Sequence, residues 1–275
     1  MRTIDEKQIK KIKDFIFKNG RLLERTLFSF FFESGSKDDV IKALIGYQNK
    51  DGGFGNGIEP DLLCPDSTGI GAETALYILD ILELSNSDIV TSIANWVVNS
   101  LNSEGYIDHP PKNLEEYPHQ PWWKNSDELR IFAVAGFLKK FGFEDKNFYS
   151  KVRTFYVKTQ IPEELQIYDY PYFLFLKYLG ESEEEKEMLQ HIISQFPSIF
   201  EKNKDHYPLF SRSWYHALDI VDKKVIENEA EKFFNGFKDD GGLKIIYQDL
   251  PWWRPIWTLD GLIQLKKSDM VAIIR

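Results

Sequence analysis

The chain has 275 residues, of which 43% are hydrophobic and 28% are charged, a balance typical of a globular protein rather than a fibrous or disordered one. Its net charge of −9 argues against a nucleic-acid binder, because binding phosphates requires clustered Lys and Arg. A helix that spans a membrane needs about 18–20 apolar residues in a row, and the chain contains no such run. The polar N-terminus also lacks the apolar core of a secretory signal, so we expect a cytoplasmic protein. Aromatic residues reach 15%, which predicts either a thick core or an aromatic-lined cavity.

Apolar residues spaced by three and four positions predict an all-α protein of about twelve helices. In chain order the expected helices are Asp5–Phe17, Thr26–Phe32, Asp38–Tyr47, Gly71–Leu84, Ile89–Leu101, Ser126–Phe141, Lys146–Lys158, Tyr172–Leu179, Glu183–Phe200, Ser213–Val221, Lys223–Phe237 and Thr258–Lys267. One segment, Leu243–Tyr247, alternates as a strand would. No Pro- or Ser-rich linker divides the chain, so we expect a single domain over residues 1–275.

Three connections share one pattern, in which a helix end and a short polar run lead to an acidic residue, a glycine and then an apolar or aromatic residue. They are Tyr47–Gly55, Leu101–Ile107 and Phe237–Leu243. Glycine suits such turns because a tight turn after a helix requires positive φ. Their spacing favours helix pairs that repeat every ~50 residues and stack on their neighbours. Six such pairs could close into a double ring around a central cavity.

The turn Gln48–Gly55 (QNKDGGFG) resembles the repeats of the terpenoid-cyclase and protein-prenyltransferase superfamily, whose fold is an α/α-toroid. Its continuation through Asn56–Leu62 and Pro65–Ser67, together with Pro121-Trp122-Trp123 and Asp240-Gly241-Gly242, is similar to a group of bacterial prenyltransferase-like proteins. The resemblance implies a closed double ring of about six helical hairpins and an apolar, isoprenoid-like substrate. The turn is informative about the fold and says little about the reaction.

The catalytic signatures of that superfamily are mostly missing. The chain contains neither the Asp-x-Asp-Asp string of class II cyclases nor the Asp-Asp-x-x-Asp run with which class I synthases hold magnesium. Protein prenyltransferases bind zinc through an Asp-x-Cys pair and a distant His, but here Leu62 stands two residues before Cys64, and Asp61 lies one residue further back.

Carboxylates in the long polar loop Gly52–Gly69 are the first catalytic candidates. Glu59, Asp61 and Asp66 lie in this loop, and Pro60 restrains Glu59 to an extended conformation. In a closed cavity one of the three carboxyl groups could act as a general acid or base. The alternative is that Glu59 and Asp61 accept hydrogen bonds from helix N-termini and stiffen the loop.

Two Pro-Trp-Trp segments are the candidate substrate-binding elements. Trp122 and Trp123 form the first, and Trp252, Trp253 and Trp257 belong to the second. Tryptophan rings can stabilise a carbocation, stack on a sugar or fill space in the core.

Other polar residues near these loops have alternative roles. His119 could shuttle protons, or bind zinc together with Asp61 and Cys64. Arg254 could pair with a substrate carboxylate or diphosphate, or with a carboxylate of the protein while its stem packs on Trp253. Asp169 could point into the cavity or cap a helix. No cofactor is firmly implied, and zinc and magnesium are the candidate metals.

The sequence thus supports two functional hypotheses and a third in reserve. The first is a cyclase-like or prenyltransferase-like enzyme acting on an isoprenoid-like substrate. The second is a carbohydrate-active hydrolase or lyase, and the third is a small-molecule binding protein without catalysis. A closed apolar pocket would favour the isoprenoid, whereas an open groove with carboxylates and amides beside Trp rings would favour the sugar.

Overall fold

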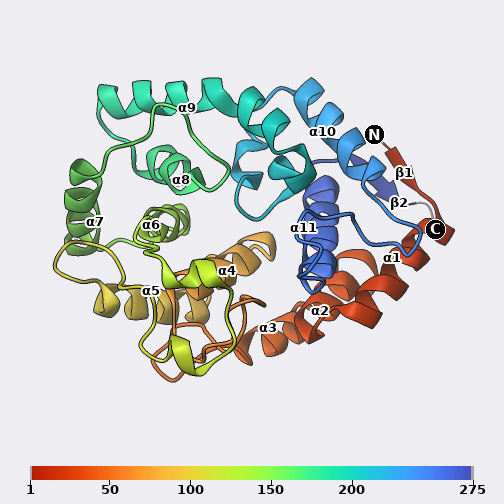
Figure 1. Cartoon of the computed structure of the whole chain (residues 1–275), viewed down its shortest axis with the longest axis horizontal. Helices are drawn as coiled ribbons and strands as arrows, with labels where there is room; N and C mark the ends of the chain where they lie inside the picture. Colours follow the sequence, from red (N-terminus) through yellow and green to blue (C-terminus); the bar gives the residue numbers. More distant parts are fainter. Residues whose placement is uncertain (1, 274–275) are drawn as a thin grey trace. The chain divides into compact units, whose positions relative to one another are not determined.

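The computed structural model of the chain describes residues 2–273 (Figure 1). These residues form eleven α-helices, five short 3-10 helices and one pair of three-residue strands, so the prediction of an all-α protein is confirmed. None of the helices in this range combines the length and the apolar character needed to cross a bilayer. The chain divides into two compact units: a central unit, Ile45–Phe196, and a terminal unit, which joins Met1–Leu44 with Pro197–Arg275. Each unit is described by itself, and the single domain stays a prediction.

The central unit is built from helix pairs. Its elements are α4 (Gly69–Ile81), α5 (Asp88–Ser100), the 3-10 helices η1 (Leu114–Glu116) and η2 (Pro121–Lys124), α6 (Arg130–Lys140), α7 (Lys146–Lys158), α8 (Tyr170–Leu179) and most of α9 (Glu183–Lys202). Helix α6 packs between α4 and α8, and most residues of these three helices are buried. Helices α5 and α7 pack on α4 and α6 and bury one face each, as their amphipathic sequences predict.

The terminal unit brings together the two ends of the described chain. It contains β1 (Arg2–Ile4), α1 (Glu6–Asn19), α2 (Leu22–Phe32), nearly all of α3 (Lys37–Ile45), the end of α9, η3 (Lys204–His206), η4 (Pro208–Phe210), η5 (Tyr215–Ala217), α10 (Lys223–Asn235), α11 (Trp253–Lys267) and β2 (Val271–Ile273). Helix α11 contacts both α1 and α2, and β1 pairs in parallel with β2. The N-terminal and C-terminal segments therefore share one core.

Three predicted elements differ most from the structure. The expected helix Ser213–Val221 is reduced to the single 3-10 turn of η5. The expected strand Leu243–Tyr247 forms only a one-residue bridge, between Leu243 and Phe237, and the Leu243 amide donates to the Thr258 hydroxyl at 2.9 Å. Helix α11 begins at Trp253, five residues before the predicted start, and therefore includes Pro255 in its first turn. A proline is tolerated there, because the N–H groups of the first turn have no partner within the helix.

The three glycine turns have the same hydrogen-bonding pattern. Each closes on an isolated antiparallel bridge, and the bridged pairs are Gln48–Phe54, Leu101–Ile107 and Phe237–Leu243. In each turn the glycine has positive φ, between 91° and 100°. The repeat that the sequence predicts is therefore present as three copies of one turn, two in the central unit and one in the terminal unit.

Each turn also packs on a helix in the same way. A Cβ on the turn glycine would lie 2.4–2.7 Å from a helix carbonyl oxygen, that of Ser92 in α5, Lys151 in α7 or Lys11 in α1. Four residues further along that helix an aromatic ring meets the residue after the glycine, and these rings are Trp96, Phe155 and Phe15. Glycine is thus required for both its backbone conformation and its lack of a side chain.

Replacing Gly105 with Ala should lower the free energy of unfolding by about 1–3 kcal/mol, because a Cβ would be strained at φ +100° and would meet the Lys151 carbonyl oxygen at 2.4 Å. Gly142→Ala is the matched control, since φ there is +80° but nothing lies within 4 Å of the added Cβ. Urea unfolding of both variants separates the two effects. Equal losses in the two variants would contradict the packing argument.

Candidate functional site

The carboxylate loop and the first Pro-Trp-Trp segment lie together in the central unit. The Gln120 amide donates to the Asp61 carbonyl oxygen, and the Leu63 amide donates to the Pro118 carbonyl oxygen, each at 3.0 Å. These bonds align residues 61–63 antiparallel to residues 118–120. Two segments that the sequence analysis selected separately are therefore neighbours.

Glu59 and Asp61 point into the protein. Their residues are 3% and 5% exposed. The Thr74 hydroxyl donates to the Glu59 carboxylate at 2.7 Å, and the Trp123 indole N–H donates to the Asp61 carboxylate at 2.9 Å. The first contact anchors the loop to helix α4 and the second anchors it to η2. Hydrogen bonds to these carboxylates thus stiffen the loop, as the alternative interpretation expected, but the donors are side chains rather than helix N-termini.

The two tryptophans of this segment differ in their surroundings. Trp123 is 9% exposed and joins an apolar cluster with Leu62, Cys64, Ile70 and Leu114, whereas Trp122 is 42% exposed. The His109 ring contacts Trp123 with centroids 5.9 Å apart, and its Nε2 lies 2.9 Å from the Trp123 carbonyl oxygen. Burial lowers the pKa of His109, so this histidine favours the neutral form.

The zinc hypothesis for Asp61, Cys64 and His119 gains no support. Cys64 is buried, and burial raises the pKa of its thiol. His119 is half-buried, and its Nδ1 lies 2.8 Å from the Tyr117 carbonyl oxygen. Within residues 2–273 no three His, Cys, Asp or Glu side chains gather where they could hold a metal ion.

The remaining candidates lie elsewhere. Asp169 precedes helix α8, but its carboxylate accepts the Gln166 amide at 2.6 Å instead of capping α8, and burial raises its pKa. In the terminal unit Trp252 is exposed, while Trp253 and Trp257 are half-buried on helix α11. Arg254 binds the Asp240 carboxylate through both terminal nitrogens at 2.9 Å, which is the intraprotein pairing that the sequence left open.

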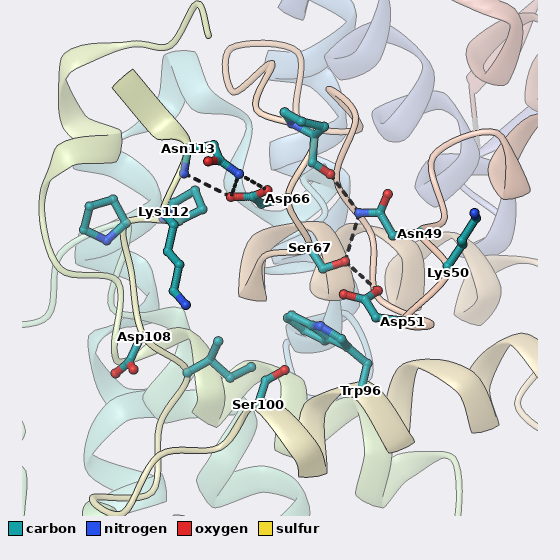
Figure 2. A pocket seen from close by; sticks show the side chains of 14 residues that line it. Asn49, Lys50, Asp51, Asp66, Ser67, Trp96, Ser100, Asp108, Lys112 and Asn113 are labelled. Atoms are coloured by element: carbon teal, nitrogen blue, oxygen red, sulfur yellow. Dashed lines mark hydrogen bonds between the residues drawn. The ribbon is translucent and has the colours of Figure 1, made fainter. Parts of the chain in front are cut away.

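Asp66, the third predicted carboxylate, lines an open groove of about 970 Å³ in the central unit (Figure 2). The groove is lined by Asn49, Lys50, Asp51, Pro65, Asp66, Ser67, Trp96, Ser100, Ile107, Asp108, Pro110, Pro111, Lys112 and Asn113. Two of the three segments that form it are the first two glycine turns and the chain that follows each, and the third is helix α5. Nine of the fourteen lining residues have polar or charged side chains, and three of the others are prolines.

One wall of the groove is a short hydrogen-bonded relay. Asn49 Nδ2 donates to Ser67 Oγ at 2.9 Å, and this hydroxyl donates to Asp51 Oδ1 at 2.8 Å. The Gly53 amide donates to the same Asp51 oxygen at 2.9 Å. The Asp51 carboxylate is thereby held in place above the ring of Trp96 (Figure 2).

The opposite wall carries Asp66 and Lys112. The backbone amide and the side-chain amide of Asn113 both donate to the Asp66 carboxylate, at 3.1 and 2.8 Å. Figure 2 shows the Lys112 side chain directed into the hollow, whereas the Lys50 side chain is directed away from it. The groove is therefore lined by three aspartates, Asp51, Asp66 and Asp108, and by one inward-pointing ammonium, and the Asp108 carboxylate accepts the Asn102 side-chain amide at 2.7 Å.

Trp96 forms part of the groove although it is only 6% exposed. Among the described residues its indole N–H makes no hydrogen bond. Sequence analysis missed Trp96, Asn49, Asp51 and Ser67 as site residues. The available signal was the turn itself, because the repeated packing places the aromatic residue of α5 beside the turn that carries Asn49 and Asp51.

A second polar cluster, buried between helices α4, α6 and α8, was also missed. Arg130 Nη1 donates to the Glu73 carboxylate at 2.8 Å and to the Tyr170 hydroxyl, which itself donates to Glu73 at 2.6 Å, while Asp127 accepts two further guanidinium bonds at 3.0 Å. Burial alone would lower the pKa of Arg130, but Asp127, Tyr170 and Glu73 outweigh it and raise the pKa above its ordinary value. Burial raises the pKa of Tyr170, which therefore stays protonated and donates. The signal in the sequence was a single charge, Glu73, in an otherwise apolar helix turn.

Comparison with known proteins adds no relative. No known protein family, no curated protein and no solved structure matches this chain.

Replacing Trp123 with Phe should lower the free energy of unfolding by about 1–3 kcal/mol, because the buried Asp61 carboxylate loses its indole donor. Trp122→Phe is the neighbouring control and should change stability by less than about 0.5 kcal/mol, since Trp122 is exposed. Chemical denaturation measures both. Equal stability of the two variants would show that the bond to Asp61 contributes nothing.

Replacing Arg130 with Met should destabilise the protein by about 3–5 kcal/mol, because the buried Glu73 and the half-buried Asp127 would be left without their cation. Tyr170→Phe removes one hydroxyl from the cluster and should cost about 1–2 kcal/mol. Lys124→Met breaks the exposed pair with Glu115 and should cost under about 0.5 kcal/mol. Thermal or urea unfolding measures these losses. An equal loss of stability in Lys124→Met and Arg130→Met would show that the cluster does not stabilise the protein.

Proposed function

We propose that the protein binds a saccharide in the groove of the central unit. The observation that carries this proposal is the lining of the groove, which combines three carboxylates, two carboxamides and a tryptophan ring at an open surface. Carboxylates and carboxamides suit sugar hydroxyl groups because together they accept and donate hydrogen bonds, and an indole offers an apolar face to the C–H groups of a sugar ring. The volume of about 970 Å³ lies near the upper end of the ~300–1,000 Å³ typical of ligand pockets.

The same features argue against the isoprenoid alternative for this groove. An isoprenoid chain is entirely apolar, so its site should be enclosed and lined by Phe and Leu. Ile107 and the prolines contribute apolar surface, but Asp51, Asp66 and Asp108 would lose the water around their remaining acceptor sites without gaining a further hydrogen-bond donor. Prenyltransferase-like chemistry therefore finds less support here than the carbohydrate alternative.

Within the proposed site each groove residue has a distinct part. Asp66 is the predicted acid that lines the groove, and Asn113 holds its carboxylate in one orientation. In a hydrolase or lyase Asp66 would be the acid or base, whereas in a binding protein it would accept hydrogen bonds from sugar hydroxyls. Glu59 and Asp61 would support the loop from behind, since Thr74 and Trp123 already engage them.

The proposal includes the closed ring of helical hairpins that the glycine turns imply. Two contacts within the terminal unit support it. The third turn, at Gly241, packs on the Lys11 carbonyl oxygen of α1 just as the earlier turns pack on α5 and α7, so the first helix takes the place of a following repeat. Strand β1 also pairs with β2, which joins the two ends of the repeat series.

Isothermal titration calorimetry with a panel of neutral oligosaccharides tests the binding proposal. At least one oligosaccharide should bind, and Asp66→Ala and Trp96→Phe should each weaken binding by about tenfold, because the first removes a hydrogen-bond acceptor and the second replaces the indole with a smaller ring. Trp122→Phe lies outside the groove lining and should leave the affinity unchanged. A folded protein that binds none of the panel, or affinities indifferent to both groove variants, would overturn the proposal.

A further inference from the structure

Two of the glycine turns carry an aspartate at the same position. Asp51 precedes Gly52-Gly53 in the central unit, and Asp240 precedes Gly241-Gly242 in the terminal unit. In both turns one carboxylate oxygen, Oδ1, accepts the amide N–H of the second glycine, at 2.9 Å for Asp51 and 3.0 Å for Asp240. The two carboxylates are therefore held in the same way by their own turns.

In the terminal unit this carboxylate carries an organic cation supplied by the chain itself. Arg254 donates from Nη2 to Asp240 Oδ1 and from Nη1 to Oδ2, each at 2.9 Å. The guanidinium carbon lies 4.7 Å from the centroid of the Phe15 ring, within the range of a cation–π interaction. The pKa of Asp240 is lowered chiefly by its hydrogen bonds from Arg254. The Asp240 carboxylate, held by its turn, and the Phe15 ring thus form a binding site for a cation.

In the central unit the corresponding site is formed by Asp51 and Trp96, and no Arg or Lys of the described residues pairs with Asp51. Trp96 stands in the place of Phe15, since each ring follows by four residues the helix carbonyl on which its turn glycine packs. Ser67 takes over one of the two bonds of the arginine, because its hydroxyl donates to Asp51 Oδ1 at 2.8 Å. The other oxygen, Oδ2, accepts no hydrogen bond from the described residues, and Figure 2 shows it on the groove side of the carboxylate, above Trp96.

We propose that the Asp51–Trp96 end of the groove is a subsite for a protonated amine, so that the saccharide it takes is an amino sugar. An ammonium at this position would donate one charge-assisted hydrogen bond to Asp51 Oδ2 and lie over the indole of Trp96, as Arg254 does at Asp240 and Phe15. The charge of the groove agrees, because three carboxylates line it and Lys50 points away. This inference rests on the proposed saccharide site and adds the charge of its ligand.

Lys112 allows the proposed ligand charge to be tested, because removing its ammonium should change the affinity in opposite directions for cationic and anionic ligands. Its ammonium points into the same hollow and makes no ion pair with the described residues, so it would repel a cationic ligand and attract an anionic one. Lys112→Met should therefore strengthen the binding of an amino sugar. Lys50→Met is the matched control and should have a smaller effect, since its side chain is directed away from the hollow.

The experiment compares two forms of one sugar by calorimetry, glucosamine oligosaccharides at mildly acidic pH and their N-acetylated, uncharged counterparts. The charged form should bind about tenfold more tightly, and Asp51→Asn should abolish that difference. An asparagine can still accept the Gly53 and Ser67 bonds through its amide oxygen, so this variant keeps the turn. Asp240→Asn changes the twin carboxylate in the terminal unit and should leave the preference intact.

The outcomes separate this inference from the proposed function. Equal binding of the charged and N-acetylated forms, or weaker amino-sugar binding by Lys112→Met, would overturn the amine subsite while the saccharide site stands. Binding of neither sugar, together with Asp51-dependent binding of a simple amine such as agmatine, would support the subsite and overturn the saccharide. Binding of no sugar and no amine would overturn both.

Discussion

The structure depends on the close approach of a glycine to the carbonyl oxygen of a helix. At Gly52, Gly105 and Gly241 the turn lies so near a helix backbone that a side chain has no room. Because the contact is made to one carbonyl oxygen, it fixes the register of the turn along the helix as well as its distance. An aromatic residue four positions further along the same helix then always meets the next residue of the turn. At the first and third turns this contact also brings the aspartate of the turn near the ring.

This register explains why the groove and the loop carboxylates have different parts. Trp96 and Asp51 reach the groove because the first turn rests on α5. Glu59 and Asp61 follow in the same loop but are turned inward, where Thr74 and Trp123 satisfy them. A buried carboxylate with a fixed donor holds a loop in one conformation, because moving the carboxylate would leave both groups buried without a hydrogen bond. The rigid inner part of the loop thus presents its outer part, with Asp66, to the groove.

The local features of the fold could be predicted from the sequence, whereas the partners of its polar groups could not. The all-α class and the glycine turns follow from short-range patterns. The early start of α11 was missed although Pro255 is compatible with the first turn of a helix, and the spacing of apolar residues did not show that the expected helix Ser213–Val221 shortens to one 3-10 turn. Asp66 was selected as a functional residue from its loop, and it lines the groove. Trp96 was missed because on sequence alone it is one more apolar position of an amphipathic helix.

The division of the chain into an uninterrupted central unit and an interrupted terminal one bears on biosynthesis. Every residue of Ile45–Phe196 leaves the ribosome before any of the segment from Pro197 onward. The central unit can therefore bury its core on the nascent chain, whereas α1 and α2 must wait for α11 and β2. During that interval the surfaces that α1 and α2 bury against α11 in the folded chain lack their partner, and exposed apolar surface of this kind favours aggregation.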